Sequence, residues 1–275
     1  MKIFLDTAEI DMISPAYSTG LINGITTNPT LIKRSGRDPV EVIKEMSAAF
    51  PNLESISAEV VADTADIDEI RAAYETGLID GVTTNPTLIR KSGRELLEVA
   101  KELQKEFPKL ESISCEVVAD TAEEMLTQAK KYYSIHPSIT IKLPCTIEGL
   151  KACKSLSEKG IKTNITLIFS IPQAVLAAKA GATYVSPFVG RLDDQQVAGL
   201  EVVRGIADMY RIHGVKTQVL SASIRSVQRA TRSWYNGAEV VTMPPKIFWQ
   251  MYNHILTDNG LEIFQKDWEE ATKSD

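Results

Sequence analysis

Apolar and polar residues alternate from position 139 to position 144, in the stretch Ile-Thr-Ile-Lys-Leu-Pro. A period of two predicts a β-strand with one apolar face, and it places Thr140 and Lys142 together on the opposite face. A lysine on a strand usually extends its long stem to water. In an enclosed polar pocket, however, lost hydration favours an uncharged amine, which can attack a carbonyl carbon. The neighbouring segments decide between these two interpretations.

Strand-like runs of this kind alternate with helical patterns along almost the whole chain. Upstream, strands are predicted over residues 3–6, 24–30 and 56–63; downstream, they are predicted over residues 161–168, 183–191, 218–223 and 240–244. Helices are predicted over residues 122–133, 148–159, 173–180 and 195–213. Such alternation is typical of a parallel sheet whose strands are joined by crossover helices. No linker-like stretch interrupts it, so we predict a single domain over residues 1–275.

The first part of the chain repeats itself with a constant offset of 57 residues. Residues 6–62 and 63–119 align without a gap, and two thirds of the aligned positions are identical. The segment Asp-Thr-Ala at residues 6–8 recurs at residues 63–65, and Thr-Asn-Pro-Thr at residues 27–30 recurs at residues 84–87. The pattern indicates a tandem duplication of two strand–helix units. A solenoid is disfavoured, because the repeat stops after residue 119.

The duplication leaves two architectures open. The second copy repeats the strands at residues 24–30 and 56–63, so counting every strand gives ten. Removing one 57-residue copy from the 275 residues leaves 218 residues and eight strand–helix units. Eight units predict an α/β fold of the closed (β/α)8 type, the TIM barrel. In that case one copy is excluded, lies outside the barrel or exchanges with a neighbouring molecule. An enlarged ten-stranded barrel is the alternative, and its interior would be wider than side chains can fill.

Residues 257–275 continue beyond the final unit. Leu261, Phe264 and Trp268 recur at helical spacing and predict a C-terminal helix. Its apolar stripe suits packing either on the chain's own barrel or on a neighbouring subunit.

Polar residues share one alternation class near the C-terminal end of most predicted strands. The opposite class is mostly apolar and is predicted to face the helices: Leu5, Val117, Ile141, Leu143, Ile165, Leu167, Val185 and Leu220. In a barrel the polar class converges at the C-terminal mouth, where active sites are built. The residues of this polar alternation class are Asp6, Asn28, Ser114, Glu116, Thr140, Lys142, Asn164, Thr166, Ser186, Phe188, Ser221, Ser223 and Arg225. Lys142 would therefore share a cavity with carboxylates, amides and hydroxyls.

These residue types support imine chemistry at Lys142. An amine attacks a ketone, and loss of water leaves a cationic imine that accepts the electrons of a cleaved carbon–carbon bond. A carboxylate must move the protons, either directly or through a water held by a hydroxyl such as that of Thr166. Amides such as Asn85 and Asn164, and a hydroxyl such as Ser186, can bind the hydroxyl groups of a sugar.

A phosphate site is predicted beside this set. Arg191 and Arg225 follow adjacent predicted strands, and Ser223 lies between the second strand and its helix. Each arginine alone is more often a surface ion-pair partner. Together at the mouth of a barrel, two arginine forks and a hydroxyl suit a phosphate group.

Composition and charge narrow the classes of partner. The chain is 44% hydrophobic and 24% charged, with a net charge of −6 and no basic cluster, so a nucleic-acid or membrane-surface partner has no electrostatic support. No apolar run approaches the roughly 18 residues of a membrane helix, and the chain starts directly as a strand rather than as a signal peptide. Three cysteines without metal-ligand spacing suit reduced thiols, and we expect a cytoplasmic location.

Cofactor signatures are missing from the sequence. It contains no Gly-rich nucleotide loop, and the three histidines lie scattered rather than beside carboxylates. We therefore expect no cofactor and no metal.

The motifs resemble those of the short-chain transaldolases, the subfamily related to fructose-6-phosphate aldolase. The resemblance covers the whole chain apart from one surplus copy. It rests on Phe-Leu-Asp-Thr-Ala at residues 4–8, Thr-Thr-Asn-Pro-Thr at 83–87, Ala-Glu-Val-Val at 58–61, Ile-Lys-Leu-Pro at 141–144, Lys-Thr-Asn-Ile-Thr-Leu-Ile-Phe at 162–169, Tyr-Val-Ser-Pro-Phe-Val-Gly-Arg at 184–191 and Ala-Ser-Ile-Arg at 222–225.

The resemblance implies a role for each candidate residue. Lys142 would form the Schiff base, the strand-one aspartate would act on substrate hydroxyls and protons, and the strand-three glutamate would work with Thr166 and a water. Arg191, Ser223 and Arg225 would bind the phosphate. The resemblance further implies sugar phosphate substrates (fructose 6-phosphate with erythrose 4-phosphate or glyceraldehyde 3-phosphate), a cytoplasmic pentose phosphate role and a homo-oligomer, often a decamer.

The duplication offers two sets of upstream partners for one lysine. The second copy supplies Asp63, Asn85 and Glu116, and it is joined directly to the Lys142 unit. The first copy supplies Asp6 and Asn28, but its Pro15 would break a helical hydrogen bond where the second copy has an alanine. We therefore predict that the second set forms the site, with Asp6 and Asn28 in reserve.

Three functions remain open. Glu116 and Phe188 resemble the transaldolase branch, whereas the aldolase branch has glutamine and tyrosine at these positions, so transfer of a dihydroxyacetone unit between sugar phosphates is favoured. The alternative within enzymes is a fructose-6-phosphate aldolase that releases free dihydroxyacetone. The alternative from another class is an inactive barrel that serves as an assembly or binding protein, because a mispaired copy could displace the catalytic carboxylates.

Overall fold

The computed structural model describes residues 4–6, 24–26 and 59–272, with side chains described from residue 61 to residue 271. The chain divides into two compact units, Ala58–Tyr252 and Met1–Ser57 with Asn253–Asp275. Each unit is described by itself. The organisation of residues 1–275 as one domain stays a prediction.

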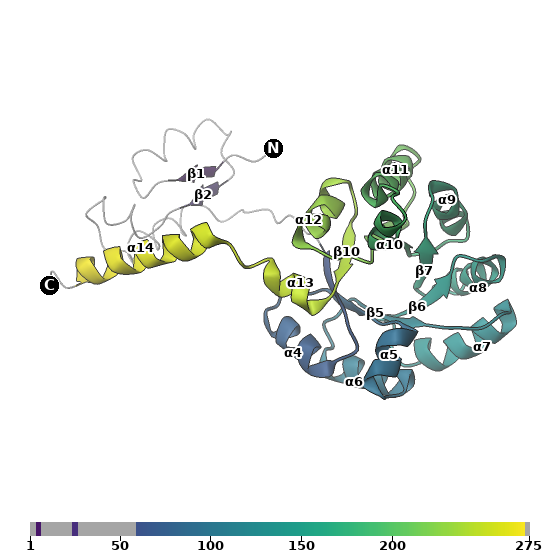
Figure 1. Cartoon of the computed structure of the whole chain (residues 1–275). Helices are drawn as coiled ribbons and strands as arrows, with labels where there is room; N and C mark the ends of the chain where they lie inside the picture. The colour runs from purple at the N-terminus through teal and green to yellow at the C-terminus, as the bar shows by residue number, and fades with distance from the viewer. Residues whose placement is uncertain (1–3, 7–23, 27–58, 273–275) are drawn as a thin grey trace. The chain divides into compact units, whose positions relative to one another are not determined.

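The unit Ala58–Tyr252 is a closed barrel of parallel strands (Figure 1). Its eight strands follow one another around the barrel in the order β10-β3-β4-β5-β6-β7-β8-β9. Their bounds are β3 Glu59–Asp63, β4 Gly81–Thr83, β5 Ser112–Glu116, β6 Ile139–Pro144, β7 Thr163–Ile168, β8 Tyr184–Pro187, β9 Gln218–Ser221 and β10 Val240–Met243. The predicted (β/α)8 TIM barrel is therefore confirmed, and the ten-stranded alternative is wrong: β3 pairs directly with β10 and closes the ring.

Helices follow the strands and surround the barrel (Figure 1). They are α4 Ile67–Glu75, α5 Pro86–Ser92, α6 Leu96–Glu106, α7 Ala122–Tyr133, α8 Ile147–Ser157, α9 Ile171–Lys179, α10 Val189–Asp194, α11 Gly199–Ile212, α12 Val227–Tyr235 and α13 Pro245–Gln250. The predicted strand over residues 183–191 ends at Pro187, and the chain then forms α10. The predicted helix over residues 195–213 begins four residues later, at Gly199.

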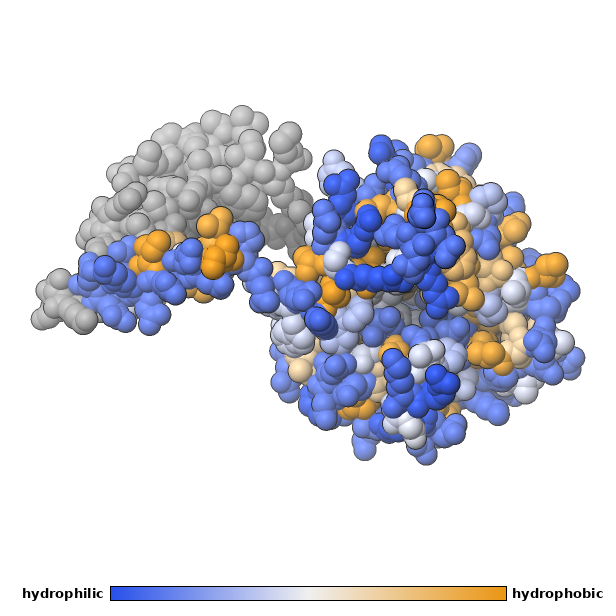
Figure 2. Space-filling view, in the orientation of Figure 1, coloured by the Kyte–Doolittle hydropathy of each residue, from blue (hydrophilic) through white to orange (hydrophobic). Residues whose placement is uncertain are grey.

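The other unit contributes two short strands and a helix to the described residues. Strand β1 (Phe4–Asp6) pairs in parallel with β2 (Gly24–Thr26), and this two-stranded sheet is separate from the barrel sheet. Helix α14 (Ile255–Thr272) carries apolar side chains at intervals, seen in Figure 2 as orange patches on blue surface, and Ile255, Leu256 and Leu261 are exposed. Within the described residues, no helix combines the length and apolar character needed to span a membrane.

The boundary between the two sequence copies falls inside the barrel. Strand β3 is built from the end of the first copy and closes with Asp63, the first residue of the second copy. Its first residue, Glu59, is the repeat counterpart of Glu116, yet Glu116 ends β5 at the opposite end of the strand. The same segment thus takes two different registers, because the strands paired on either side, rather than its own sequence, set its position.

Alternation along the strands separates an outer core from the barrel interior. Ile141 and Leu143 are fully buried in the outer core with Met125 of α7 and Ala152 of α8. The interior holds a second apolar cluster, formed by Val61, Tyr184, Leu220, Ala222 and Val240 from β3, β8, β9, β10 and the residue after β9. Tyr184 and Val240 lie at the N-terminal ends of β8 and β10, whereas Leu220 and Ala222 also line a cavity at the C-terminal ends of the strands.

Two apolar residues were assigned by the sequence pattern to the wrong face. Leu220 belongs to the interior cluster, and its neighbour Ser221 points outwards, where its Oγ lies 2.8 Å from the Oγ of Ser233 on α12. The polar pair Ser221 and Ser223 therefore does not share an inward face. A serine that hydrogen-bonds to a covering helix can replace an apolar residue on the outer face, and the alternation rule does not detect this.

Leu167 is the second of these residues. The pairing of β7 with β8 shifts register between Ile165 and Ile168, and Leu167 has a left-handed backbone with φ of 60°. This irregularity returns Ile168 to the outer core and turns Leu167 towards the cavity. An extra residue in a strand breaks the period of two, which explains why the pattern failed here.

The barrel predicts different stabilities for two chains that each keep a single copy. Deleting residues 6–62 leaves Ala72 inside α4, whereas deleting residues 63–119 places Pro15 at the aligned position. A proline in a helix interior costs about 3 kcal/mol, so we expect the second chain to be the less stable by about that amount in urea unfolding. Equal stability, or a more stable chain with the first copy, would contradict the placement of the second copy in the barrel.

Candidate active site

A cavity of about 550 Å³ opens at the C-terminal ends of the barrel strands. Every strand of the barrel, or the loop that follows it, contributes to its wall. The predicted site residues that line it are Asp63, Asn85, Glu116, Lys142, Asn164, Thr166, Ser186, Phe188, Arg191 and Ser223. The structure therefore brings together most of the residues that the sequence pattern singled out, all of them from the second copy or from downstream of it.

Lys142 lies at the centre of the polar wall. Strands β5 and β6 pair Glu116 with Lys142, and the Nζ of Lys142 lies 3.0 Å from Oε2 of Glu116. Nζ also donates a hydrogen bond to the backbone oxygen of Thr84 at 3.3 Å. The two side chains are only 8% and 16% exposed. Each partner compensates the other in this buried position, because removal of one would leave an uncompensated buried charge.

A second carboxylate lies in the same cavity. Asp63 ends β3, and its Oδ1 accepts a hydrogen bond from Thr83 at 3.0 Å, while the Thr83 hydroxyl lies 2.7 Å from the hydroxyl of Thr242 on β10. Burial raises the pKa of the Asp63 carboxyl above its ordinary value; the charge of Lys142 and the bond from Thr83 act in the opposite direction. A carboxyl with a raised pKa can exchange protons closer to neutral pH than an exposed one.

Amide and hydroxyl groups complete the wall on β7 and β8. Ser186 donates a hydrogen bond of 2.7 Å to Oδ1 of Asn164. The amide nitrogen of Asn164 and the hydroxyl of Thr166 are buried and have no hydrogen-bond partner among the residues that the structure describes. Unpaired buried donors are rare in folded proteins, so these two atoms indicate where a ligand or a water would bind.

Asn85 has a structural task as well as a place in the wall. It is the N-cap of α5, and its Oδ1 accepts a hydrogen bond of 3.1 Å from the backbone N–H of Leu88. The side chain is thereby fixed in orientation, and its amide nitrogen remains available to donate.

The predicted phosphate residues lie at the edge of the cavity, in two different settings. Arg191 lines the cavity and stacks over the ring of Phe188, with 5.0 Å between Cζ and the ring centroid. Ser223 also lines it and has a left-handed backbone, with φ of 59°. Arg225 is not among the lining residues; it forms a two-bond ion pair with Asp194 at the end of α10.

The reserve residues of the first copy, Asp6 and Asn28, belong to the other unit. Asp6 ends β1, which pairs with β2 outside the barrel sheet, and its side chain is not described. Asn28 lies outside the described residues. The roles of Asp6 and Asn28 therefore stay predictions.

Sequence reasoning missed several residues of the wall. Thr83 and Thr242 follow the inward alternation of their strands and could have been found from it, whereas Leu167 enters through a bulge that no pattern marks. The contact of Lys142 with the backbone oxygen of Thr84 has no side-chain signal at all. Among the described residues, no group of three or more His, Cys, Asp or Glu side chains is placed to hold a metal ion, and the predicted absence of a cofactor stays a prediction.

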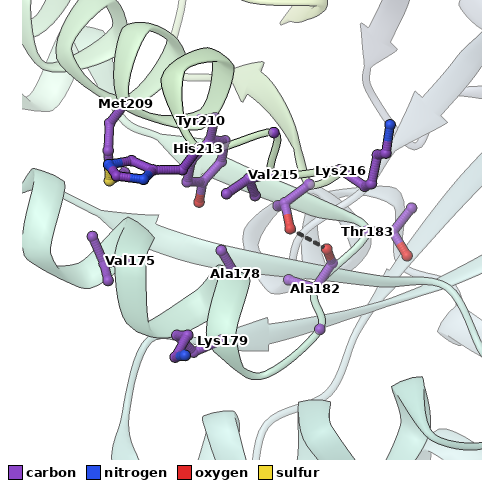
Figure 3. A pocket seen from close by; sticks show the side chains of 13 residues that line it. Val175, Ala178, Lys179, Ala182, Thr183, Met209, Tyr210, His213, Val215 and Lys216 are labelled. Atoms are coloured by element: carbon purple, nitrogen blue, oxygen red, sulfur yellow. Dashed lines mark hydrogen bonds between the residues drawn. The ribbon is translucent and has the colours of Figure 1, made fainter.

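A larger hollow of about 970 Å³ lies between α9 and α11 (Figure 3). Its walls are mostly apolar, including Val175, Met209 and Val215, and Thr217 donates a hydrogen bond across it to the backbone oxygen of Ala182. Thr183 and Thr217 precede β8 and β9, so this hollow lies beside the N-terminal ends of the strands, away from Lys142. It contains no carboxylate, and we assign the chemistry to the smaller cavity.

Comparison with known proteins gives one consistent family. The model of the transaldolase/fructose-6-phosphate aldolase family matches residues 3–59 and again residues 60–274. The chain is 51% identical over 213 residues to a protein named probable transaldolase from Alkaliphilus metalliredigens; the match covers 77% of this chain and 98% of the relative. Proteins with the same name from Paracoccus denitrificans (50% identity, 75% and 94% covered) and Symbiobacterium thermophilum (47% identity, 76% and 96% covered) match similarly.

The raised pKa of Asp63 predicts a pH-dependent stability. A carboxyl whose pKa is higher in the folded than in the unfolded state stabilises the fold at acid pH, and this contribution is lost as pH rises through the folded-state pKa. The Asp63→Asn variant cannot ionise. Its stability relative to the parent should therefore be greater at about pH 7.5 than at about pH 4.5 in urea unfolding.

The exposed Asp120 provides the matched control, because Asp120→Asn makes the same chemical change outside the cavity. A stability difference between Asp63→Asn and the parent that did not vary with pH, or that fell towards pH 7.5, would contradict the raised pKa.

Proposed function

Because the chain belongs to the transaldolase/fructose-6-phosphate aldolase family, we propose that it transfers a dihydroxyacetone unit between sugar phosphates through a Schiff base on Lys142. The observation that carries the proposal is the buried contact of Lys142 with Glu116, in one cavity with a second carboxylate, Asp63. This constellation supplies a nucleophile together with two separate proton-transfer groups.

Imine formation is the first proposed stage. The Lys142 amine attacks the C2 carbonyl of a ketose phosphate such as fructose 6-phosphate, and the carbonyl oxygen takes up a proton to give a carbinolamine. A second proton on that oxygen lets it leave as water, and the nitrogen lone pair forms the C=N bond of the iminium. We assign the supply and removal of these protons to Glu116, whose Oε2 lies 3.0 Å from Nζ, acting through a water bound at the hydroxyl of Thr166.

Carbon–carbon cleavage is the second stage. Asp63 takes the proton of the C4 hydroxyl, the C3–C4 bond breaks, and its electron pair moves into the iminium to give an enamine on Lys142. The shortened aldose phosphate leaves. An acceptor such as erythrose 4-phosphate or glyceraldehyde 3-phosphate then enters, its aldehyde carbon bonds to the enamine, and Asp63 returns the proton to the new hydroxyl. Hydrolysis of the imine frees the product ketose and Lys142.

Binding contacts follow from the remaining wall. The amides of Asn85 and Asn164 and the hydroxyl of Ser186 suit the hydroxyl groups of the sugar, and the unpaired amide nitrogen of Asn164 supports this assignment. Arg191, Ser223 and Arg225 are proposed to bind the phosphate at the edge of the cavity. We further propose a cytoplasmic role in the pentose phosphate pathway. We also propose a homo-oligomer, such as a decamer, in which α14 packs on a neighbouring subunit.

The aldolase alternative releases the enamine as free dihydroxyacetone instead of passing it to an acceptor. Transfer is favoured because Glu116 contacts the lysine and Phe188 presents a ring without a hydroxyl to the cavity, the residue types of the transaldolase branch. An inactive barrel remains the alternative of another class.

Trapping the imine tests the proposal. Borohydride reduction in the presence of fructose 6-phosphate should fix a three-carbon adduct on Lys142, detected by peptide mass spectrometry, and Lys142→Met should prevent both the adduct and turnover. Lys162 instead donates a hydrogen bond to the backbone oxygen of Glu111, so Lys162→Met should leave the adduct and the turnover intact. An adduct on another residue would refute the mechanism, and a folded parent without adduct would support the inactive barrel.

Acceptor dependence separates transfer from simple cleavage. With fructose 6-phosphate alone, we expect free dihydroxyacetone to form at least about a hundredfold more slowly than product forms when erythrose 4-phosphate is present, because the enamine waits for an aldehyde. A coupled assay for each product measures the two rates. Equal rates with and without acceptor would identify an aldolase.

A further inference from the structure

The geometry points to Asp194 as a positioning residue that holds Arg225 with one edge turned to the phosphate, while Gly190 leaves the space for that edge. The inference rests on the proposed function, since it concerns the phosphate group of the same substrates. Neither Asp194 nor Gly190 lines the cavity, and the sequence pattern assigned neither of them a role.

Asp194 binds Arg225 end-on. Nη1 of Arg225 donates to Oδ1 of Asp194, and Nη2 donates to Oδ2 at 2.5 Å. This two-bond pair uses one N–H of each terminal nitrogen, and a guanidinium has five N–H groups. The Nε–H therefore stays available, and the planar fork cannot rotate it away while both terminal bonds persist.

Gly190 shows where this edge lies. A Cβ added to Gly190 would stand 2.7 Å from Nε of Arg225 and 2.9 Å from Oγ of Ser223, both too close for a real side chain. The two polar atoms thus converge beside one glycine, whose N–H donates a 3.1 Å bond to the Ser223 backbone oxygen. Because Ser223 lines the cavity, Arg225 reaches the cavity edge with its Nε side.

The charged side chains near Arg225 and Asp194 form ion pairs. Asp193 lies beside Asp194 in the sequence and forms its own ion pair with Arg229, with 3.1 Å between Oδ2 and Nε. Arg225 lowers the pKa of the Asp194 carboxyl, so Asp194 is ionised at neutral pH and its pair with Arg225 is maintained.

Removing Asp194 has opposite expected effects, depending on whether this residue orients Arg225 or competes with the phosphate for it. If Asp194 merely occupied Arg225, its removal would free the arginine and strengthen phosphate binding. If Asp194 orients Arg225, its removal loosens the fork and weakens phosphate binding, although a negative charge has been lost. The free Nε edge beside Ser223 favours the second outcome.

The test compares Asp194→Asn with Asp193→Asn, which removes the same charge one residue away without touching Arg225. For Asp194→Asn we expect KM for erythrose 4-phosphate to rise about tenfold with kcat within about twofold of the parent, because uniform binding is lost. For Asp193→Asn we expect KM within about twofold of the parent.

A second measurement keeps this inference distinct from the proposed reaction. Inorganic phosphate should raise the Tm of the parent through binding to the folded state, and Asp194→Asn should need about tenfold more phosphate for the same shift. Borohydride trapping with unphosphorylated dihydroxyacetone should be equal in parent and variant. An unchanged or lowered phosphate requirement in Asp194→Asn, or a parent that phosphate does not stabilise, would overturn the role of Asp194; failed trapping on Lys142 would instead overturn the proposed function.

Discussion

The buried contact between Lys142 and Glu116 depends on the closed ring of strands around it. Two charged groups leave water at a high cost in free energy, and only close geometry with further hydrogen bonds compensates for it. Here the pairing of β5 with β6 places the two residues side by side, and the backbone oxygen of Thr84, from the loop after β4, adds a second contact to the amine. Three consecutive elements must therefore keep their register for the amine to be held. The barrel meets this condition because each strand is fixed by a neighbour on both sides.

The barrel interior holds an apolar cluster on one part of the ring and buried polar groups on another. Val61, Tyr184, Leu220 and Val240 come from β3, β8, β9 and β10, whereas the hydroxyl oxygens of Ser112 on β5 and Thr140 on β6 lie 2.9 Å apart. Ionisable groups at the C-terminal ends of the strands are largely kept from water, and the side chains of Lys142 and Glu116 are only 8% and 16% exposed. Asp63 shows the effect directly, because burial raises its pKa despite the nearby positive charge of Lys142. Two carboxylates therefore share one cavity in different surroundings, Glu116 beside the amine of Lys142 and Asp63 bonded to Thr83.

Much of this arrangement could be predicted from the sequence, for identifiable reasons. The eight strands and the grouping of Lys142, Glu116 and Asn164 follow from alternation, because these strands are regular and their faces differ in polarity. Prediction failed where tertiary contacts replace local pattern. Ser221 is polar but bonds to a covering helix, Leu167 is apolar but enters the cavity through a register shift, and Arg225 is held by a carboxylate at the end of α10. The two registers taken by the repeated strand segment, in β3 and in β5, could not be read from sequences that are nearly identical.

The position of the copy boundary, at the carboxyl end of β3, has an evolutionary consequence. The junction leaves Asp63 in a strand whose partners are β4 and β10, so residues 59–62 of the first copy complete the barrel together with the residues downstream. A duplication at this point adds length to the chain without altering any residue of the cavity wall, and a further copy inserted at the same junction would do so again. The length of the chain before the barrel can therefore change while the described wall of the cavity, which begins at Asp63, keeps its sequence.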